Sequence, residues 1–334
     1  MQSVSRWTGL LLVLIAPLGL AAQVAKSGDI AIRVTLLSMP YVGERNAPEL
    51  SRGPDYLAEG GIQKMLEERG AQVKVGAAIK LSPEDDKAYG SWNRLALANG
   101  ELAKAIAGAR RAGNVPIGLL ANCSSILGML SGLQHSGASS KPLRVGLVFI
   151  DAHGDYNTPE TTLSGMLGGM PVAIANGLCL TRMRLKTGLE PAIPGRHIVE
   201  ICVRDTDPLE QELLDRSEIQ QLSLEDVRTR SANLHAAMKR LAESTDVIYV
   251  HVDMDALDPR EVAGHPLTVP GGPTSLELAA ALEEMFKYEK AAAFGVASTP
   301  YDDRDKNGAS RQAAYNLILG AVKGVQQRTS VSLR

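Results

Sequence analysis

The sequence predicts an α/β fold built around a parallel central sheet. Short apolar runs rich in β-branched residues alternate with longer segments of helical periodicity, which is the pattern of successive βα units. Two of the short runs are almost wholly apolar, as expected for strands that helices cover on both faces. No Pro/Ser-rich linker separates these units, so residues 23–334 are predicted to form a single domain.

Seven segments are predicted to be strands because they are short, apolar and β-branched. They are residues 30–38, 71–75, 115–121, 144–150, 197–203, 246–252 and 291–298. The fourth and the sixth are the nearly continuous apolar runs, and we expect them at the centre of the sheet.

The segments between the strands carry helical periodicity. They are residues 54–68, 92–111, 124–133, 208–216, 223–243, 275–288 and 309–326. Thr274 and Glu277 form a capping-box pattern, which predicts a helix that begins near residue 275. Ligands of such sheets bind at the carboxyl ends of the strands, so functional residues are expected directly after strands.

Composition places the chain among ordinary globular proteins and excludes one class of partner. Hydrophobic residues make up 45% and charged residues 22% of the chain. The net charge is −2 and basic residues are scattered among acids, which argues against a nucleic-acid partner. The three cysteines, Cys123, Cys179 and Cys202, are too few for a disulfide scaffold.

Residues 1–22 have the layout of a secretory signal peptide. Arg6 precedes an apolar run from about Trp7 to Leu20, and two alanines follow. The run is shorter than the about 20 residues that span a bilayer, although an uncleaved anchor is the alternative. The mature protein is predicted to begin near Gln23, to be secreted or periplasmic, and to have no membrane partner after signal cleavage.

Two acidic motifs directly follow the two most apolar strands. Asp151, His153 and Asp155 come after the fourth strand, and Asp253 and Asp255 come after the sixth. In extended chain, residues i and i+2 point to the same side, so these side chains can converge at one edge of the sheet. Clustered carboxylates repel each other unless cations neutralise them, so the spacing predicts a metal site. The alternative is a set of surface acids in turns.

A site with mainly oxygen ligands and one imidazole suits Mn²⁺. Zn²⁺ is typical of sites rich in thiolates. The carboxylates suffice to bridge two ions, which would lower the pKa of a shared water toward neutrality. We therefore expect a hydrolase with two Mn²⁺ ions per chain, Zn²⁺ being the alternative, and a small-molecule substrate.

The same motifs resemble those of the ureohydrolase family, which includes arginases and agmatinases. Asp151–Pro159 matches the family pattern D-A-H-x-D-x-x-T-P, and Asp253–Pro259 matches D-x-D-x-x-D-P. The resemblance runs from about Ile30 to the C-terminus and includes "RGPDYL" and "VRDTDPLE". It implies a three-layer α/β/α sandwich, a binuclear manganese centre, hydrolysis of a guanidino-type C–N bond, and a homo-oligomer of three or six chains.

The resemblance also implies roles for individual residues. The implied metal ligands are Asp151, His153, Asp155, Asp253 and Asp255, with Asp151 and Asp253 bridging. Asn157 and Ser164 match residues that contact the α-carboxylate of the substrate in arginase, and Asp207 matches one that receives the α-amino group. The alternatives are that Asn157 shapes a turn and that Asp207 caps the following helix.

Three positions depart from the family pattern. In "LANCSS", Cys123 stands at the position of a metal-binding histidine, so it is either a thiolate ligand or a buried, unliganded cysteine. Gly168 replaces a histidine that shuttles protons in arginases. Ala297 replaces a glutamate that pairs with the guanidinium group, a contact worth roughly 1.5–3 kcal/mol. L-arginine is therefore not the expected substrate.

Proton delivery must then come from other groups, and His265, Asp155 and solvent are the candidates. His265 lies in the long loop after the second acidic motif and could act as a general acid, although a surface histidine is the simpler interpretation. His251 is expected to point the same way as Asp253 and Asp255 and to orient a ligand.

Three functions compete at this point. The first is a two-metal hydrolase of a linear guanidine, amidine or amide that is not a standard arginase. The second is a single-zinc amidohydrolase, as in the related histone deacetylase fold. The third is a metal-binding pseudoenzyme, against which the retained acids argue because clustered unpaired charge costs stability.

Overall fold

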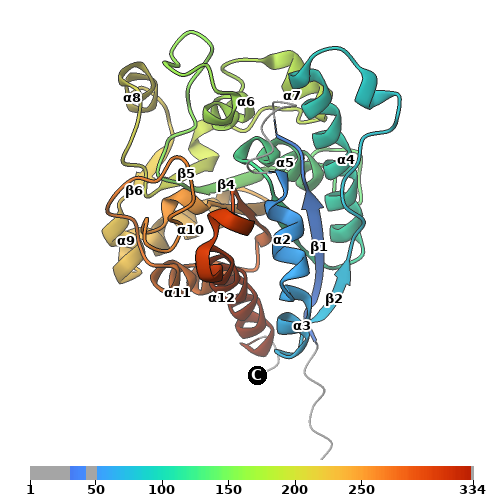
Figure 1. The fold of residues 1–334 in the computed structure, drawn as a ribbon, viewed down its shortest axis with the longest axis vertical. Helices are drawn as coiled ribbons and strands as arrows, with labels where there is room; N and C mark the ends of the chain where they lie inside the picture. The colour runs from blue at the N-terminus through green and yellow to red at the C-terminus, as the bar shows by residue number, and fades with distance from the viewer. Residues whose placement is uncertain (1–30, 43–50, 332–334) are drawn as a thin grey trace, which may run out of the picture. The chain divides into compact units, whose positions relative to one another are not determined.

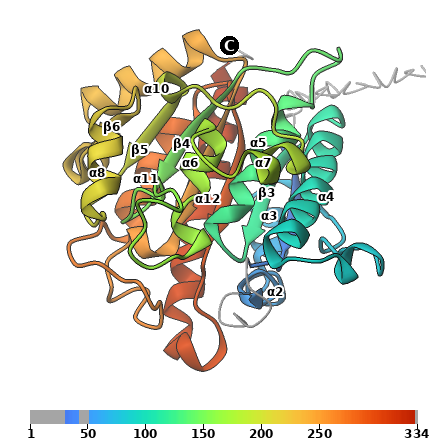
Figure 2. The same ribbon diagram turned by 90° about the horizontal axis from the view of Figure 1, so that it is seen from above.

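An eight-stranded parallel sheet forms the centre of the fold (Figures 1 and 2). Its strands, in the spatial order β2-β1-β3-β8-β7-β4-β5-β6, are β1 (Arg33–Met39), β2 (Gln72–Val75), β3 (Val115–Leu120), β4 (Val145–Ile150), β5 (Ile198–Ile201), β6 (Gln220–Leu222), β7 (Val247–Asp253) and β8 (Ala291–Ala297). Every neighbouring pair is parallel. The predicted fold class is therefore confirmed, and the two most apolar strands, β4 and β7, pair at the centre as expected.

Residues 31–42 and 51–331 are described in this computed structural model. The predicted signal peptide, residues 1–22, lies outside these ranges and stays a prediction. Within the described ranges, no helix combines the length and the apolar character that crossing a membrane would require.

Helices connect the strands and cover both faces of the sheet (Figure 2). They are α2 (Gly53–Glu59), α3 (Ile62–Glu67), α4 (Ser91–Arg111), α5 (Ile126–Gln134), α6 (Pro171–Asn176), α7 (Thr181–Thr187), α8 (Pro208–Asp215), α9 (Leu224–Thr229), α10 (Ala232–Ser244), α11 (Ser275–Phe286) and α12 (Ala309–Val331). One apolar core lies against α4 to α7 and the other against α2, α3 and α9 to α12. The capping box at Thr274 and Glu277 is present and begins α11 as predicted.

The main differences from the predicted elements have local causes. The predicted helix 54–68 is two helices because Gly61 takes a left-handed φ of 96° between them. Likewise, the predicted helix 223–243 divides at Arg230, whose φ is 50°. The prediction also missed β6, a polar strand of three residues at the sheet edge, and the short helices α6 and α7.

The strand register brings four chain segments to one edge of the sheet. Ile150 pairs with Val252 across β4 and β7, and Ala297 lies beside both Asp253 of β7 and Leu120 of β3. Residues that directly follow these strands therefore meet above the carboxyl ends of four adjacent strands. This is the edge at which parallel sheets bind ligands.

Two glycines give a matched test of helix packing. A Cβ at Gly320 of α12 would collide with the backbone oxygen of Ala279 in α11, whereas a Cβ at Gly108, exposed on α4, would meet nothing within 4 Å. We expect Gly320→Ala to lower the free energy of unfolding by about 1–3 kcal/mol. Gly108→Ala should raise it by about 0.5–1 kcal/mol because alanine favours helix. Denaturant titration checks both values, and equal effects would contradict this account of the α11–α12 contact.

Candidate metal centre

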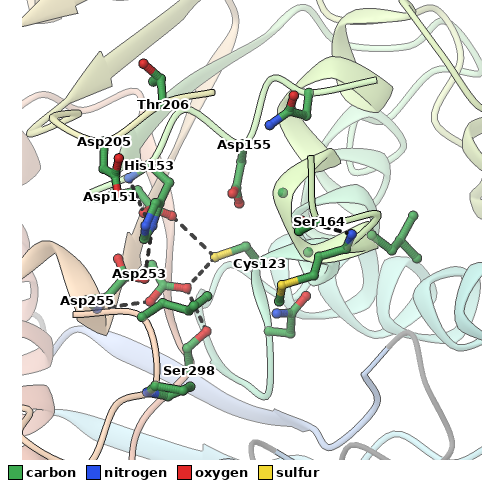
Figure 3. A pocket seen from close by; sticks show the side chains of 18 of the residues that line it. Cys123, Asp151, His153, Asp155, Ser164, Asp205, Thr206, Asp253, Asp255 and Ser298 are labelled. Atoms are coloured by element: carbon green, nitrogen blue, oxygen red, sulfur yellow. Dashed lines mark hydrogen bonds and ion pairs between the residues drawn. The ribbon is translucent and has the colours of Figure 1, made fainter. Parts of the chain in front are cut away.

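A cavity of about 600 Å³ opens at the carboxyl ends of the central strands (Figure 3). All the residues predicted for the site line it, namely Cys123, Asp151, His153, Asp155, Asn157, Ser164, Asp207, Asp253, Asp255 and His265. The structure therefore brings them together, although their chemical roles stay predictions.

The two acidic motifs use the same local geometry. The Oδ1 atom of Asp151 accepts the backbone N–H of His153 at 2.8 Å, and Oδ1 of Asp253 accepts the N–H of Asp255 at 3.0 Å. Each bond turns the chain directly after its strand and directs the i+2 side chain back to the first. A further bond, from the N–H of Ala152 to Oδ1 of Asp255 at 3.3 Å, joins the two loops.

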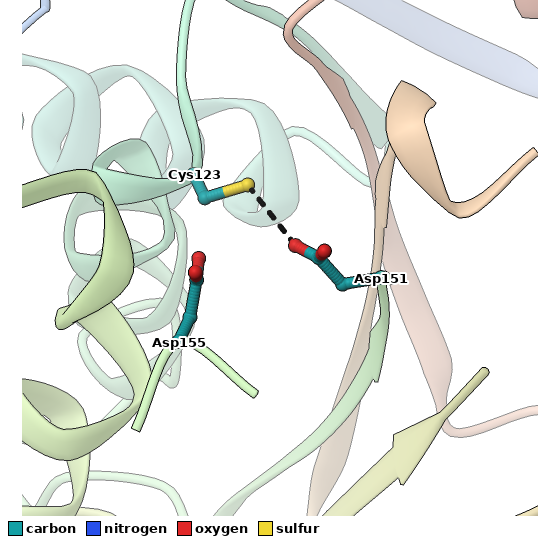
Figure 4. Close-up of side chains that lie close together, drawn as sticks. All are labelled: Cys123, Asp151 and Asp155. Carbon is teal, nitrogen blue, oxygen red and sulfur yellow. Dashed lines mark hydrogen bonds between the residues drawn. The ribbon is translucent and has the colours of Figure 1, made fainter. Parts of the chain in front are cut away.

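The ligand-type atoms fall into overlapping groups whose members lie within 4.8 Å of one another. One group contains Cys123, Asp151 and Asp155 (Figure 4), and a second contains Asp151, His153 and Asp255. In the second, Nδ1 of His153 lies 3.3 Å from Oδ1 of Asp151 and 3.2 Å from Oδ2 of Asp255. Because Asp151 belongs to both groups, two neighbouring cations could share its carboxylate.

The electrostatics of the cavity favour bound cations. Burial, with repulsion from neighbouring acids, raises the pKa of Asp253 to about 7 and that of Asp255 to about 6. Burial lowers the pKa of His153, but its bonds to Asp151 and Asp255 outweigh this and raise the pKa to about 12. No lysine or arginine of the described chain lines the cavity, so His153 is the protein cation nearest to these acids.

Cys123 begins a short 3₁₀ helix, η2 (Cys123–Ser125), just after β3. Its buried Sγ lies 2.6 Å from Oδ2 of Asp253 and 3.7 Å from Oδ2 of Asp151. His251, predicted to orient a ligand, is fully buried in β7 and places Nε2 3.3 Å from this sulfur. The predicted site residue that His251 contacts is therefore Cys123.

The surface-loop interpretation of His265 is wrong, because its side chain is only 2% exposed. Nε2 lies 3.6 Å from Oδ1 of Asp253, while Nδ1 accepts the N–H of Leu267 at 3.2 Å. An acceptor at Nδ1 places the proton of a neutral ring on Nε2. Nε2 has no hydrogen-bond partner among the described residues, so it is a buried donor directed toward the acids.

The position of this proton decides whether His265 is a metal ligand or a hydrogen-bond donor. Its nitrogens lie close enough to Asp253 and Asp255 to form a third ligand-type group. A metal ligand must present a lone pair, however, and Nδ1 already accepts the Leu267 N–H while Nε2 carries the proton. We therefore interpret His265 as a hydrogen-bond donor in the cavity.

The structure also identifies residues that the sequence reasoning missed. Ser298, with a left-handed φ of 61°, donates its hydroxyl to Oδ2 of Asp253 at 2.6 Å. Glu210 of α8 accepts the N–H groups of Tyr156 and Asp207 and so holds the loop that carries Asp155. Ser298 could have been found from its place directly after a strand, and Glu210 from its place three residues after Asp207, as in a capping box.

The predicted recognition residues form one wall of the cavity. Oδ2 of Asp207 accepts Nδ2 of Asn157 at 3.2 Å and the N–H of Leu163 at 3.0 Å. Asp207 is also the N-cap residue of α8, as the alternative interpretation proposed. Ser164 is exposed at the rim and accepts the N–H of Met166. Asp207 can therefore cap α8 and line the cavity at the same time.

At two positions that depart from the family pattern, the residue present has no ionisable side chain. Gly168 lies in the 3₁₀ helix η3 (Leu167–Gly169), where a Cβ would be 3.2 Å from Nδ2 of Asn122. Ala297 is fully buried at the end of β8. Asn122, itself on the cavity wall, therefore supplies an amide beside the position of the missing histidine.

Comparisons with known proteins agree with this geometry. The profile described as the arginase family matches residues 32–322. An arginase from Bacillus caldovelox is 26% identical over 297 residues, covering 86% of this chain and 98% of that one. Human mitochondrial arginase-2 is 28% identical over 257 residues, covering 73% and 71% of the two chains.

Solved structures show the same fold. The native B. caldovelox arginase superposes with a TM-score of 0.73 at 25% identity, covering 88% of this chain and 98% of that one. Formimidoylglutamase from Bacillus subtilis superposes with a TM-score of 0.66 at 18% identity, covering 90% and 89%. The second likeness concerns the fold alone.

The raised carboxyl pKa values predict how the stability of the metal-free protein depends on pH. Each of these carboxyls has a higher pKa in the folded protein than its ordinary value of 3.8. Its stabilising contribution to the fold is complete below pH 3.8 and is lost as the pH rises to the folded pKa. The melting temperature of metal-free protein should therefore fall between about pH 4 and pH 7, and the raised pKa of His153 acts in the same direction above pH 6.5. Added divalent cations should raise the melting temperature most near pH 7. Calorimetry that finds the metal-free protein more stable at pH 7 than at pH 5 would contradict this.

Proposed function

The chain belongs to the arginase family, and we propose that it is a two-metal hydrolase that cleaves a C–N bond of a linear guanidine, amidine or amide other than L-arginine. Membership makes it a metal-dependent hydrolase of carbon–nitrogen bonds other than peptide bonds. The observation that carries the finer proposal is the group of four buried aspartates and the partly buried His153 that the loops after β4 and β7 place on the cavity floor.

The donor set fits divalent cations. The proposed ligands are Asp151, His153, Asp155, Asp253, Asp255 and Cys123. Oxygen donors with one imidazole suit Mn²⁺, and the sulfur also admits Zn²⁺. When bound, a pair of such cations lowers the pKa of a water toward neutrality and holds it for attack.

His265 is proposed to act through the hydrogen that it holds on Nε2. The bond from Leu267 fixes the ring as a donor toward the cavity, and burial lowers the pKa of the imidazole, which favours this neutral form. A fixed donor stabilises negative charge that develops on a reacting oxygen or nitrogen. Asp155, whose carboxylate lies near Cys123 and Asp151, is the second proposed group for proton transfer, with solvent as the remaining source.

Two positions that the family pattern uses near a guanidinium group offer it no side-chain acceptor in this chain. Guanidinium offers only N–H donors, so it needs acceptors, but Ala297 and Gly168 offer none. Two hydrogen-bond donors also line the cavity, His265 Nε2 and the amide nitrogen of Asn122. We propose that Asn157, Asp207 and Ser164 contact the polar end of a small-molecule substrate. A homo-oligomer, a trimer or a hexamer, is part of the same proposal.

A single-zinc amidohydrolase is the second candidate. The observation that favours it is the group Asp151, His153 and Asp255, which has the Asp, His and Asp composition of a deacetylase site. Metal content separates the candidates, because about one Zn²⁺ per chain supports this function and about two cations per chain support the first.

Replacement of one acid tests the proposed function. We expect Asp253→Asn to abolish cation binding and turnover, because the carboxylate contacts Cys123 and forms a ligand-type group with Asp255 and His265. Asp258→Asn is the matched control, since Asp258 lies in the same loop but pairs with Arg260 outside the cavity. Elemental analysis measures the metal, and ammonia or urea release from a panel of guanidino, amidino and amide compounds measures turnover. An Asp253→Asn protein that keeps metal and activity would refute the proposal, and L-arginine as the best substrate of the panel would refute its substrate part.

A second variant separates the donor role of His265 from a ligand role. His265→Ala should lower turnover by about 10²-fold, the usual effect of losing one such donor, and leave metal content unchanged. His235→Ala, on α10 and away from the cavity, should change neither. Loss of a metal ion in His265→Ala would contradict the assignment of the proton to Nε2.

A further inference from the structure

A buried row of three polar side chains lies beneath the acids of the metal centre. The hydroxyl of Tyr249 lies 2.8 Å from Nδ1 of His251, and Nε2 of His251 lies 3.3 Å from Sγ of Cys123. Tyr249, His251 and Asp253 alternate along β7, so they share one face of the sheet. The row therefore runs from the apolar core to the cavity floor.

Packing fixes the orientation of this row. The ring of Phe149 stacks on His251 with centroids 5.1 Å apart and planes inclined by 5°. A Cβ at Gly295, which pairs with His251 in the neighbouring strand, would collide with the hydroxyl of Tyr249. Glycine at this position leaves room for the hydroxyl, and the neighbouring rings hold the imidazole in place.

The direction of each hydrogen bond follows from the partners available. Among the described residues, the buried hydroxyl of Tyr249 has His251 Nδ1 as its hydrogen-bond partner, so it donates there. His251 then carries its proton on Nε2 and donates to the sulfur of Cys123. The opposite arrangement would leave the Tyr249 hydroxyl hydrogen buried without an acceptor, which costs about 1–3 kcal/mol.

The sulfur of Cys123 therefore has two distinct sides. From the core it accepts an N–H bond, and toward the cavity it faces the carboxylates of Asp151, Asp155 and Asp253. A thiol has one proton, so it can donate to one of these carboxylates but cannot neutralise all three. A cation among them would take the sulfur as a thiolate ligand, with the thiol proton leaving to a neighbouring carboxylate or to solvent. The bond from His251 would orient and stabilise the sulfur there.

We propose that Tyr249 and His251 hold Cys123 as a sulfur ligand of the metal centre, and that this ligand makes its site prefer Zn²⁺ or Co²⁺ to Mn²⁺. The inference rests on the proposed function, because it requires cations among the carboxylates. Sulfur ligands favour Zn²⁺, while Mn²⁺ favours oxygen, so the preference follows from the donor type. Tyr249 and His251 act through Cys123 and are positioning residues.

Cobalt reports directly on the sulfur. Co²⁺ added to the metal-free full chain should produce a sulfur-to-cobalt charge-transfer band in the near ultraviolet. The band should be absent in Cys123→Ser and present in Cys179→Ser, the matched control, because Cys179 is buried outside the cavity. Cobalt bound without such a band would overturn the inference.

Affinity measurements test the positioning residues and the preference. Tyr249→Phe and His251→Gln should each weaken Zn²⁺ binding by about 10–100-fold and shift the cobalt band, as loss of a partner behind a ligand does. Tyr288→Phe, whose hydroxyl bonds a backbone oxygen away from the cavity, should do neither. Cys123→His should shift the preference toward Mn²⁺ in a Zn²⁺/Mn²⁺ competition.

The results also separate the two proposals. Absence of any cation binding by the native chain would overturn the proposed function. Binding of two cations per chain, with no charge-transfer band and no change of preference in Cys123→His, would overturn the sulfur ligand alone. Unchanged Zn²⁺ affinity and band position in both Tyr249→Phe and His251→Gln would refute their positioning role.

Discussion

The constraint on which this site depends is the burial of like charges at the carboxyl ends of two adjacent strands. β4 and β7 pair in register at the centre of the sheet. Asp151, directly after β4, and Asp253, the last residue of β7, each turn the chain through their own carboxylate. Helices on both faces keep water away from the strands, so the acids repel each other in a medium that screens them weakly. In the metal-free protein, protonated His153 is the counter-charge of these acids. As a metal ligand its ring would be neutral, so bound cations would then have to supply the neutralising charge.

Much of this arrangement could be predicted from the sequence, because the apolar pattern and the alternation of side chains along the strands already determine it. Apolar continuity placed β4 and β7 at the centre, and alternation in extended chain placed the acids and His153 on one side. The divided helices were missed because left-handed residues such as Arg230 leave little trace in a periodicity. The burial of His265 was missed because a long loop folds back over the acids, which is a tertiary effect without a local signal. The hydrogen-bonded row of Tyr249, His251 and Cys123 could not be predicted, because it depends on which strand lies beside β7 as well as on the alternation along β7.

The departures from the family pattern form a consistent set when they are placed in the structure. Gly168 and Ala297 remove groups that could handle a guanidinium, whereas His265 and Asn122 bring hydrogen-bond donors to the same cavity. Cys123 replaces an imidazole, and it lies against a histidine and a tyrosine that orient its sulfur. In the proposed function, these changes alter the metal ligands and the substrate contacts while they keep the acidic floor. A dead site would have no physical reason to retain that floor, because its unpaired charge destabilises the fold.

Anomalous diffraction from crystals of the protein grown with Mn²⁺ or Zn²⁺ tests the central claim most directly. The account predicts two peaks among the side chains of Asp151, His153, Asp155, Asp253 and Asp255, with the carboxylates of Asp151 and Asp253 between the peaks. A well-ordered cavity without anomalous density at either absorption edge, in crystals saturated with both ions, would contradict it.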